Sequence, residues 1–447
     1  MKNPLRVRFV RDVAMTGSAQ LIQAICAMLG GILVARFLGP AAKGQLTVLI
    51  ALGAMAVLLC SFGVHQSSIY FLGRHKDERT EIVSTNTVFA LVGGLLTAAA
   101  LAAVAIAFQR QLLHGIALSL FFVYLAAVPA NYLNEFVRRT LLGTGRVVLY
   151  SIPDLVQGVS LLFGTALVIL SFGKHVEPLV VLRVATEVGT AVFMLAYLWR
   201  VVPFRLKASG QLLRRQLGYG IKNYASSIFW LFLITGDAIL VNHFLGNSAT
   251  GVYSVAVSLG LPVTMLGAVV GTLIFQRVAA DESEESRREN TNRVVRVLVV
   301  IASSVVIALG LAANWLVPFV YGAEFHGAID ALWLLLPGLL ALALESVVMG
   351  YLAGNGSPPV VYWGPFLGLV VNIGVNLVLI PRLGINGASI SSSIGYSLVL
   401  VIALIYYMRL TDSRLGDVLM PRRSDFAALL HSSGGDDGAG RAEAQVA

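Results

Sequence analysis

Charged residues are scarce in this chain of 447 residues. Asp, Glu, Lys and Arg make up 12% of the sequence, whereas 57% of it is hydrophobic. A soluble domain carries about 25% charged residues, because charged side chains must cover its surface. This composition excludes a soluble globular protein, and it indicates that the excess apolar surface faces lipid.

Cysteine is nearly absent, and the motifs of common enzyme classes are missing. The two cysteines, Cys26 and Cys60, lie inside apolar runs and are interpreted as small hydrophobic residues rather than as a disulfide or a metal site. The sequence has no phosphate-binding loop, no glycine-rich dinucleotide fingerprint and no metal-ligand spacing. We therefore expect no catalytic residues, no metal and no organic cofactor, and we predict that the protein is not an enzyme.

Apolar runs recur along the whole chain. A helix needs about 20 mainly apolar residues to cross the hydrocarbon core of a bilayer. The runs predict an all-α integral membrane protein with about twelve transmembrane helices. The predicted spans are 12–37, 44–72, 83–108, 112–142, 147–172, 178–199, 219–245, 251–279, 294–313, 328–353, 359–381 and 384–408.

The basic residues predict the orientation of these spans. If the N-terminus is cytoplasmic, 26 of the 32 lysines and arginines fall in inside segments, 5 fall in outside segments, and Arg183 lies within a span. Cytoplasmic loops carry such an excess in membrane proteins, so both termini are predicted to be cytoplasmic. The net charge of +9 follows from this topology, and we expect no nucleic-acid partner.

The two halves of the chain share short motifs in the same order. Each of four motifs in the first half recurs 206–212 residues later, as six spans per half would require for a parallel repeat. The pairs are Phe37-Leu38-Gly39 with Gly44 and Phe244-Leu245-Gly246 with Gly251, Thr85-Asn86 and Thr291-Asn292, Leu142-Gly143-Thr144-Gly145 and Ala353-Gly354-Asn355-Gly356, and Pro153 and Pro365.

This repeat predicts two pseudo-symmetric six-helix lobes. The lobes cover 1–199 and 219–408, with a basic cytoplasmic linker at 200–218 and a cytoplasmic, partly disordered tail at 409–447. Lobes that rock about a central cleft expose it to each side of the membrane in turn, which is alternating access. The alternative is a duplicated helical bundle without transport.

Two of these motifs resemble a known family. Arg36-Phe37-Leu38-Gly39-Pro40, followed by Gly44, resembles the end of the first span in polysaccharide-export and oligosaccharide flippase proteins. Asp237-Ala238-Ile239-Leu240, with Phe244-Leu245-Gly246 and Gly251-Val252-Tyr253-Ser254 after it, resembles the seventh and eighth spans of the same family. The family includes the O-antigen flippases and belongs to the superfamily of the MATE exporters and the lipid II flippase.

The resemblance implies a function and partners. Its substrate would be an undecaprenyl-pyrophosphate-linked oligosaccharide, flipped across the bacterial inner membrane for surface polysaccharide synthesis. The implied partners are this lipid-linked oligosaccharide, membrane lipids and polysaccharide assembly proteins. Two additional C-terminal spans, common in lipid II flippases, are not seen in this sequence.

Four basic residues stand at the cytoplasmic ends of the spans that line the cleft in that family. Arg11 and Lys222 open the first and seventh spans, and Arg74 and Arg277 close the second and eighth. Such a ring could bind the pyrophosphate through charge-assisted contacts. The alternative is ordinary anchoring of helices by basic residues on the inside.

Charges within spans are costly and are candidates for ion coupling. The candidates for a sodium or proton site are Glu345, Glu135, Asp154, Arg183 and Glu187. Glu345 has no obvious local partner. Arg183 and Glu187 could instead pair with each other, and Glu135 and Asp154 could pair with nearby arginines, as structural ion pairs. His65 could titrate near neutrality or pack as a hydrogen-bonded histidine.

Two further charges lie near the outer ends of spans. Arg36 and Asp237 are predicted to form a cross-lobe pair that closes the outer gate, and the alternative is that each anchors its own helix. The segment 281–296 mixes charges of both signs and is interpreted as a solvated cytoplasmic linker.

Two other functions compete with a flippase. One is a cation-coupled, MATE-like exporter of small molecules, although a cationic mouth would repel a cationic substrate. The other is a membrane enzyme such as an O-antigen polymerase or ligase, which generally needs a larger external domain or loop with catalytic groups.

Overall fold

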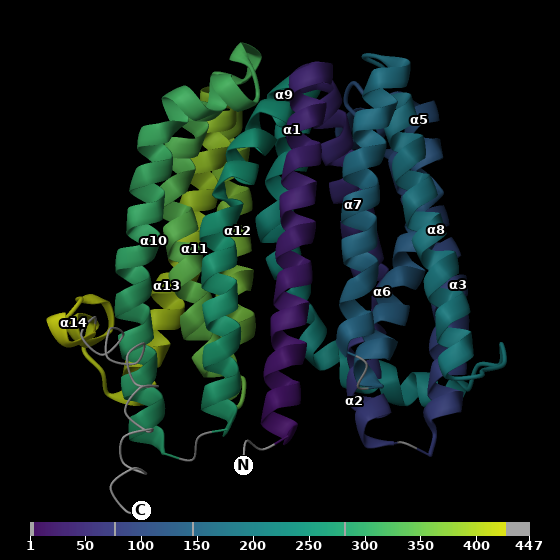
Figure 1. Ribbon diagram of the computed structural model, residues 1–447. Coiled ribbons are helices and arrows are strands. Elements are labelled where there is room, and N and C mark those ends of the chain that lie inside the picture. Colours follow the sequence, from purple (N-terminus) through teal and green to yellow (C-terminus); the bar gives the residue numbers. More distant parts are fainter. Residues whose placement is uncertain (1–3, 76, 145–146, 281–282, 426–447) are drawn as a thin grey trace, which may run out of the picture. The chain divides into compact units, whose positions relative to one another are not determined.

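The computed structural model describes residues 4–75, 77–144, 147–280 and 283–425, and within these ranges the regular secondary structure is entirely helical. The helices are drawn in Figure 1. Their bounds are α1 Pro4–Ser61, α2 Val64–Arg74, α3 Arg79–Ala107, α4 Gln109–Leu112, α5 Leu118–Leu125, α6 Ala127–Gly143, α7 Val147–Phe172, α8 Glu177–Val201, α9 Gly210–Ala280, α10 Glu284–Val320, the short 3₁₀ helix η1 Ala323–Phe325, α11 Ala328–Gly354, α12 Val360–Leu383, α13 Ile385–Thr411 and α14 Leu415–Leu419.

Helix length and hydropathy confirm a multi-pass membrane protein. Ten helices of the described chain are long and apolar enough to cross a membrane. Two of them, Gly17–Ser61 with 45 residues and Tyr224–Ala279 with 56, are more than twice the length of about 20 residues that one crossing needs. Twelve crossings and the cytoplasmic position of both termini stay predictions.

Two predicted spans are each built from two helices. The second span, 44–72, is interrupted at Phe62 and Gly63, where the backbone takes positive φ angles of 46° and 72°. The fourth span, predicted at 112–142, begins only at Leu118 and is divided between α5 and α6 at Ala126. Apolar content gave no sign of either break, because each falls inside a continuous apolar run.

The repeated Phe-Leu-Gly motif marks the same backbone break in both long helices. Gly39 has φ 83° and ψ −177°, and Gly246 has φ 80° and ψ −177°. This combination is essentially restricted to glycine, because any side chain would clash there. The structure thus confirms the repeat at this motif, and α1 and α9 each bend at the position where the sequence predicts the end of a span.

The two breaks lie against each other across a local twofold axis. A Cβ atom added to Gly44 would lie 1.8 Å from the carbonyl oxygen of Asn247, and one added to Gly251 would lie 1.9 Å from the carbonyl oxygen of Pro40. Pro40 and Asn247 are equivalent in the repeat, as are the two glycines, so the contact is reciprocal. Only glycine allows the two backbones to approach this closely.

The chain forms two compact units, each described by itself. Unit 1 contains the described residues up to Ser258 with 315–329 and 376–388, and unit 2 contains the remaining described residues. In unit 1, α1 packs on α7, α3 packs on α6, and α6 packs on α8. The aromatic rings of Tyr132 and Phe136 on α6 are fully buried and stack with centroids 5.2 Å apart. The predicted division into lobes at 199 and 219 stays a prediction.

Unit 2 has its own core around α11 and α13. Tyr351 and Tyr407 are fully buried, and their rings meet edge to face at 4.9 Å between centroids. The second half of α9 packs on α11 through small residues, since a Cβ on Gly267 would lie 2.4 Å from the Cα of Ala343. Small residues let membrane helices approach closely, which replaces the hydrophobic driving force that lipid does not supply.

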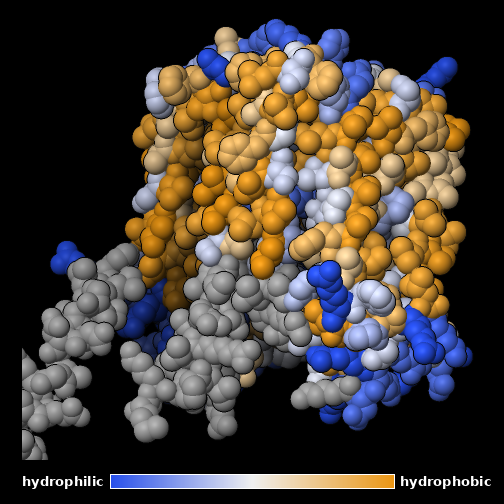
Figure 2. All heavy atoms as spheres, turned by 45° about the vertical axis from the view of Figure 1, so that its right-hand side comes forward, coloured by the Kyte–Doolittle hydropathy of each residue, from blue (hydrophilic) through white to orange (hydrophobic). Residues whose placement is uncertain are grey.

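The outward faces of the helices are apolar. Leu96 on α3, Leu170 on α7 and Phe193 on α8 are 65%, 85% and 58% exposed. Figure 2 shows apolar side chains over the middle of the face it draws and hydrophilic side chains at its two ends. Such a band is the surface expected toward lipid.

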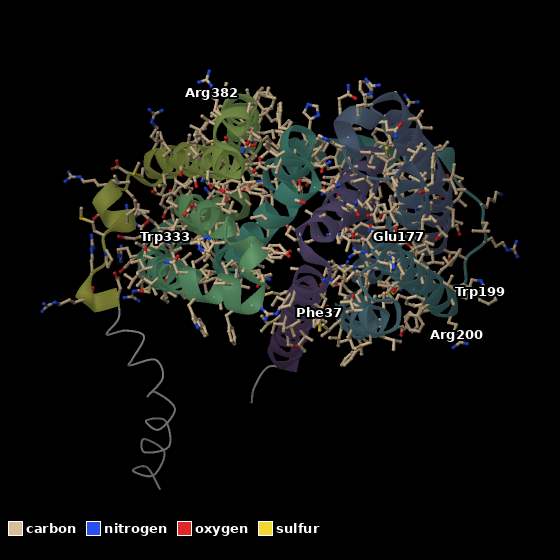
Figure 3. All side chains as sticks on the ribbon, turned by 90° about the horizontal axis from the view of Figure 1, so that it is seen from above. Phe37, Glu177, Trp199, Arg200, Trp333 and Arg382 are labelled. Atoms are coloured by element: carbon tan, nitrogen blue, oxygen red, sulfur yellow. The ribbon has the colours of Figure 1, made fainter. Side chains whose placement is uncertain are left out.

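Four of the five tryptophans lie near helix ends and are exposed. Trp199, Trp315, Trp333 and Trp363 are 45–64% exposed, and Figure 3 shows Trp199 beside Arg200 at the rim of the view. Tryptophan prefers the membrane–water interface, which explains these positions. Trp230 is the exception, because it lies within α9 and is only partly exposed.

The predicted solvated linker at 281–296 is wrong for most of its length. The helix α10 begins at Glu284, and Arg296 is only 5% exposed. Its guanidinium donates two hydrogen bonds of 2.7 Å to the carboxylate of Asp425. A third reaches the backbone oxygen of Asp417 in α14 at 2.5 Å. The first part of the predicted tail, up to Asp425, is therefore docked on α10 by a buried bidentate ion pair.

We expect Gly44→Ala to destabilise the fold. The new methyl group would force the two backbones apart, and overpacking of this kind costs about 1–3 kcal/mol. The matched control is Gly236→Ala in α9, where nothing lies within 4 Å of the added Cβ and where alanine favours the helix by up to about 1 kcal/mol. Thermal unfolding of both purified variants measures the difference, and an unchanged melting temperature for Gly44→Ala would contradict the backbone contact.

The docked segment should detach when Asp425 loses its charge. The bidentate hydrogen bonds from Arg296 lower the pKa of Asp425 below its ordinary value of 3.8. The stabilisation is therefore present above about pH 4 and is lost as the pH falls through the lowered pKa. Asp425→Asn should cause the same loss at pH 7, by about 3 kcal/mol, because it leaves a buried guanidinium unpaired.

Hydrogen–deuterium exchange of residues 415–419, corrected for the intrinsic effect of pH on exchange, measures this release. The control is Glu285→Gln, since Glu285 is 83% exposed and lies 3.8 Å from Arg288. Equal protection in Asp425→Asn and in the parent protein at pH 7 would show that the ion pair does not hold the segment.

Candidate functional site: a polar cavity beside helix α9

A cavity of about 540 Å³ lies in unit 1 between α1, α2, α6 and the first part of α9. Four elements far apart in the sequence supply its walls. Its polar lining consists of Ser61, His65, Gln66, Asn131, Glu135, Arg139, Ser226, Ser227, Trp230 and Thr235. The remaining lining is apolar, so the cavity combines hydrogen-bonding groups with an aromatic ring in a membrane-spanning region.

Glycine brings the backbone before α2 close to α9 beside this cavity. The backbones of Gly63 and Gly220 meet, since a Cβ on Gly63 would lie 2.7 Å from the carbonyl carbon of Gly220. Beside them Gln66 donates a hydrogen bond of 2.9 Å to the hydroxyl of Ser227. The rings of Tyr70 and Tyr219 stack with centroids 4.4 Å apart. The break at Phe62 and Gly63 thus serves packing, because it allows α2 to lie along the first part of α9.

His65 faces the cavity in an apolar and aromatic surrounding. It is 3% exposed, and its ring lies 6.0 Å from Phe136 and 6.5 Å from Tyr224. Its Nδ1 atom is buried and has no hydrogen-bond partner among the described residues. The side chain therefore packs against aromatic rings, and a titrating role for His65 stays a prediction.

A network of charges borders the cavity. The carboxylate of Glu135 lies 2.8 Å from Arg139 and 4.0 Å from Arg138, and Arg138 lies 2.8 Å from Asp154 on α7. Arg138 also lies over the ring of Tyr150 at 4.9 Å. The structure therefore brings Glu135 and Asp154 together through Arg138, and both carboxylates have cationic partners.

Arg183 and Glu187 extend the charged groups to α8. They form an ion pair at 3.2 Å, as their spacing of four residues predicts. Glu187 is 3% exposed and also accepts a hydrogen bond of 3.3 Å from Asn134 on α6. These contacts describe an ion pair within α8 that a hydrogen bond from Asn134 joins to α6, and a role in ion coupling stays a prediction.

Glu345 differs from the other predicted coupling residues. It lies on α11 in unit 2 and is 2% exposed. Its Oε1 atom is buried without a hydrogen-bond partner among the described residues. An unpaired carboxylate is costly in such surroundings unless it takes up a proton or a cation.

The two predicted gate residues have other partners in the structure. Arg36 donates hydrogen bonds to the backbone oxygens of Pro318 and Phe319 at 3.4 and 2.6 Å, where α10 ends. Asp237 is 1% exposed and accepts hydrogen bonds from Tyr253 at 3.1 Å and from Asn376 at 2.7 Å. Arg36 thus caps a helix, and a pairing between Arg36 and Asp237 stays a prediction.

The predicted cationic ring is described only in part. The side chains of Arg11 and Lys222 lie outside the described residues. Arg74 in unit 1 is exposed and its guanidinium lies 3.3 Å from the hydroxyl of Tyr70, whereas Arg277 is exposed in unit 2. Binding of a pyrophosphate by these four residues stays a prediction.

A comparison with known protein families matches the larger part of the chain. Residues 33–330 match the family described as "Polysaccharide biosynthesis protein". The chain belongs to this family. The chain is 23% identical over 379 residues to a putative O-antigen transporter of Shigella flexneri, a match that covers 80% of this chain and 88% of the relative. It is also 23% identical over 212 residues to an uncharacterized membrane protein of Methanocaldococcus jannaschii, a match that spans 41% of the archaeal protein.

Solved structures of two transporter types share the fold of this family member. The lipid II flippase MurJ in an inward closed conformation superposes with a TM-score of 0.72 at 12% identity and covers 91% of this chain and 89% of MurJ. An inward-facing MATE multidrug transporter superposes with a TM-score of 0.68 at 17% identity and covers 87% of this chain and 94% of the transporter. The protein is thus a multi-pass membrane protein with the fold of these transporters, as the sequence resemblance implied.

Three parts of the site could not be identified from the sequence. Trp230 lies in an apolar run without a distinguishing pattern, and only its separation from the predicted span ends sets it apart from the other tryptophans. Gln66 and Ser227 are distant in sequence and meet only in the fold. Lys43 lies between the first two predicted spans, and only the fold shows that it lines a second cavity.

We expect Arg138→Leu to destabilise the protein by about 3–5 kcal/mol, because it leaves the buried carboxylate of Asp154 without its cation. The double variant Arg138→Leu with Asp154→Leu should regain much of this loss. The control is Arg215→Leu, since Arg215 and Glu78 are 45% and 38% exposed and form a surface pair at 3.4 Å whose loss costs less than about 1 kcal/mol. Thermal unfolding measures all three, and equal effects of the two single variants would contradict a buried network.

Proposed function

We propose that the protein flips an undecaprenyl-pyrophosphate-linked oligosaccharide from the inner to the outer leaflet of a bacterial inner membrane. The observation that carries this proposal is the family match over residues 33–330. The named relative, a putative O-antigen transporter, covers most of both chains and supports the same class of substrate. In this proposal the protein delivers the lipid-linked oligosaccharide for surface polysaccharide synthesis and interacts with polysaccharide assembly proteins. It carries out no covalent chemistry.

The cavity beside α9 fits the sugar part of such a substrate. Sugar rings bind through hydroxyl hydrogen bonds and through contact of their C–H faces with aromatic rings. Trp230 offers the ring, and Gln66, Asn131 and Ser226 offer the hydrogen-bonding groups. The basic residue of the cavity, Arg139, is paired with Glu135, so the cavity suits a glycan better than a pyrophosphate. The pyrophosphate would be held elsewhere, by the predicted ring of Arg11, Arg74, Lys222 and Arg277.

Transport in this proposal is coupled to a sodium ion or a proton. Glu345 is the preferred coupling residue, because its buried Oε1 atom has no hydrogen-bond partner among the described residues. Glu135, Asp154, Arg183 and Glu187 are weaker candidates, because each already belongs to an ion pair.

A cation-coupled exporter of small molecules is the second candidate. The similarity of the fold to a MATE multidrug transporter favours it, and a carboxylate such as Glu135 could attract a cationic substrate. The ion pairs of that carboxylate argue against it, since they offset its charge.

Deletion of the protein should make the native host accumulate its lipid-linked glycan on the inner leaflet. We expect surface polysaccharide to fall at least about tenfold in the deletion strain and to return when the parent chain is supplied. Glycan accessibility to a membrane-impermeant lectin, with and without disruption of the membrane, measures the leaflet. Normal surface polysaccharide together with new sensitivity to cationic drugs would favour the exporter instead.

The complemented strain also tests the cavity. Trp230→Ala should lower the restored polysaccharide about threefold to tenfold, since a well-placed aromatic contact contributes about 0.5–1.5 kcal/mol. Trp363→Ala is the matched control, because Trp363 is 60% exposed at the start of α12. An immunoblot must show that both variants are expressed equally. Equal polysaccharide levels from the two variants would contradict a role of the cavity in binding the glycan.

A further inference from the structure

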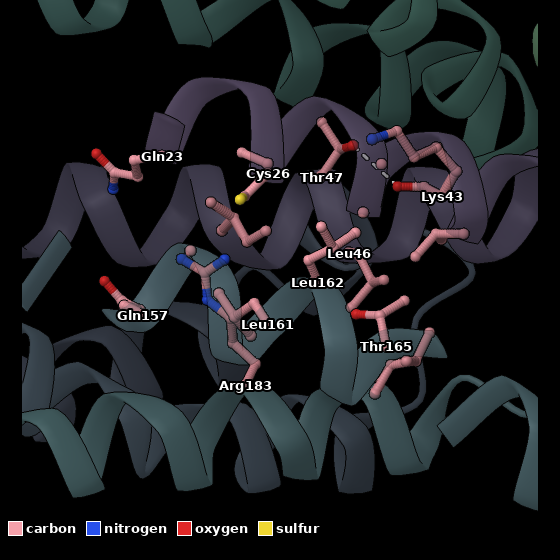
Figure 4. A pocket seen from close by; sticks show the side chains of 17 residues that line it. Gln23, Cys26, Lys43, Leu46, Thr47, Gln157, Leu161, Leu162, Thr165 and Arg183 are labelled. Carbon is pink, nitrogen blue, oxygen red and sulfur yellow. Dashed lines mark hydrogen bonds between the residues drawn. The ribbon is translucent and has the colours of Figure 1, made fainter. Parts of the chain in front are cut away.

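A second cavity lies within unit 1, between α1, α7 and α8 (Figure 4). Its volume is about 320 Å³. Most of its wall is apolar, with leucines such as Leu161 and Leu162 on α7. Four uncharged polar side chains interrupt this wall, and they are Gln23, Thr47, Gln157 and Thr165. Each lies within a membrane-spanning helix, where a polar side chain is unusual without a partner.

Two cations face this cavity, and only one is neutralised. Figure 4 shows Arg183 of α8 pointing between α1 and α7, and Lys43 on the second half of α1. The guanidinium of Arg183 lies 3.2 Å from Glu187, so its charge is offset. Among the described residues Lys43 has no ion-pair partner, since its backbone oxygen accepts from Thr47 but its ammonium meets no carboxylate. The cavity therefore carries one uncompensated positive charge.

The backbone around Lys43 is shaped to hold its ammonium group in the cavity. A Cβ atom on Gly31 would lie 3.0 Å from the Nζ atom of Lys43. The ammonium thus lies against Gly31, which leaves the space that a side chain would fill. The break at Gly39 turns α1 back on itself and brings Lys43 to this place. A single cation in an apolar wall is costly unless an anion or water accompanies it.

We propose that this cavity binds the carboxylate of an acidic sugar, with Lys43 as its ion partner. One uncompensated charge matches a singly charged carboxylate better than a doubly charged phosphate. A water molecule occupies about 30 Å³ of liquid, so the cavity has room for a sugar ring and is far larger than a halide needs. The amides of Gln23 and Gln157 and the hydroxyl of Thr165 match the hydroxyl groups of a sugar.

This inference rests on the proposed function and narrows its substrate. If the protein flips a lipid-linked glycan, the cavity takes one acidic unit of that glycan, and glycans that contain a uronic acid are preferred. The cavity is distinct from the one beside α9, since α1, α7 and α8 line it and α9 does not.

Binding of free glucuronate to the purified full-length protein tests the proposal without transport. Thermal stabilisation or calorimetry should show saturable binding of glucuronate, at least about tenfold tighter than glucose and tighter than inorganic phosphate. Lys43→Gln should weaken glucuronate binding at least tenfold. Lys174→Gln should leave it unchanged, because Lys174 is exposed between α7 and α8.

A second variant keeps the test valid if Lys43→Gln does not fold. Thr165→Val is nearly isosteric and retains every charge, and it should weaken glucuronate about threefold to tenfold. Equal binding by the parent and by Lys43→Gln, or binding of glucose as tight as that of glucuronate, would overturn the proposal, as would tighter binding of phosphate. Glucuronate binding by a protein whose deletion leaves surface polysaccharide normal would retain the acidic-sugar site and reject the flippase function.

Discussion

The contact between two backbones at Gly44 and Gly251 is the constraint on which the rest of unit 1 depends. Gly44 lies against the carbonyl of Asn247, and Gly251 lies against the carbonyl of Pro40, which is the equivalent contact in the other half of the repeat. The contact requires both chains to bend sharply just before it, and Gly39 and Gly246 allow this because no side chain restricts their backbone. A single pattern of two glycines, used twice, thus sets where α1 and α9 turn and where the local twofold axis passes.

This arrangement explains why polar groups can exist in so apolar a chain. Lipid offers no hydrogen bonds, so each polar or charged group must find a partner within the protein or face a cavity. Arg138 pairs with Asp154, and Arg183 pairs with Glu187. His65, Lys43 and Trp230 line cavities instead. Among these three, Lys43 lines its cavity without an ion-pair partner among the described residues, so its ammonium group is available to a substrate.

Family membership and the two cavities give different information: the first concerns the class of protein, and the second concerns the parts of a substrate. The family match assigns the protein to a family of polysaccharide biosynthesis proteins, and the solved structures show the fold that it shares with known transporters. The side chains of the cavities indicate which part of a substrate each one suits, because aromatic and amide groups favour a sugar whereas an unpaired ammonium favours an anion. The docked segment around Asp425 shows in addition that the C-terminal region is part of the folded structure of unit 2 up to that residue.

The sequence by itself determined the membrane class and the all-helical fold, because lipid imposes helix length and apolar composition directly on the residues, and it showed the repeated motif at which α1 and α9 bend. It also predicted the pair of Arg183 and Glu187, since four residues along a helix is a local distance. It did not determine the partners of Arg296, Lys43 or Gln66, because these meet residues on other helices and a one-dimensional pattern holds no information on such contacts. Only the tertiary structure decided which charges are paired and which face a cavity, since that depends on how the helices pack around the glycines.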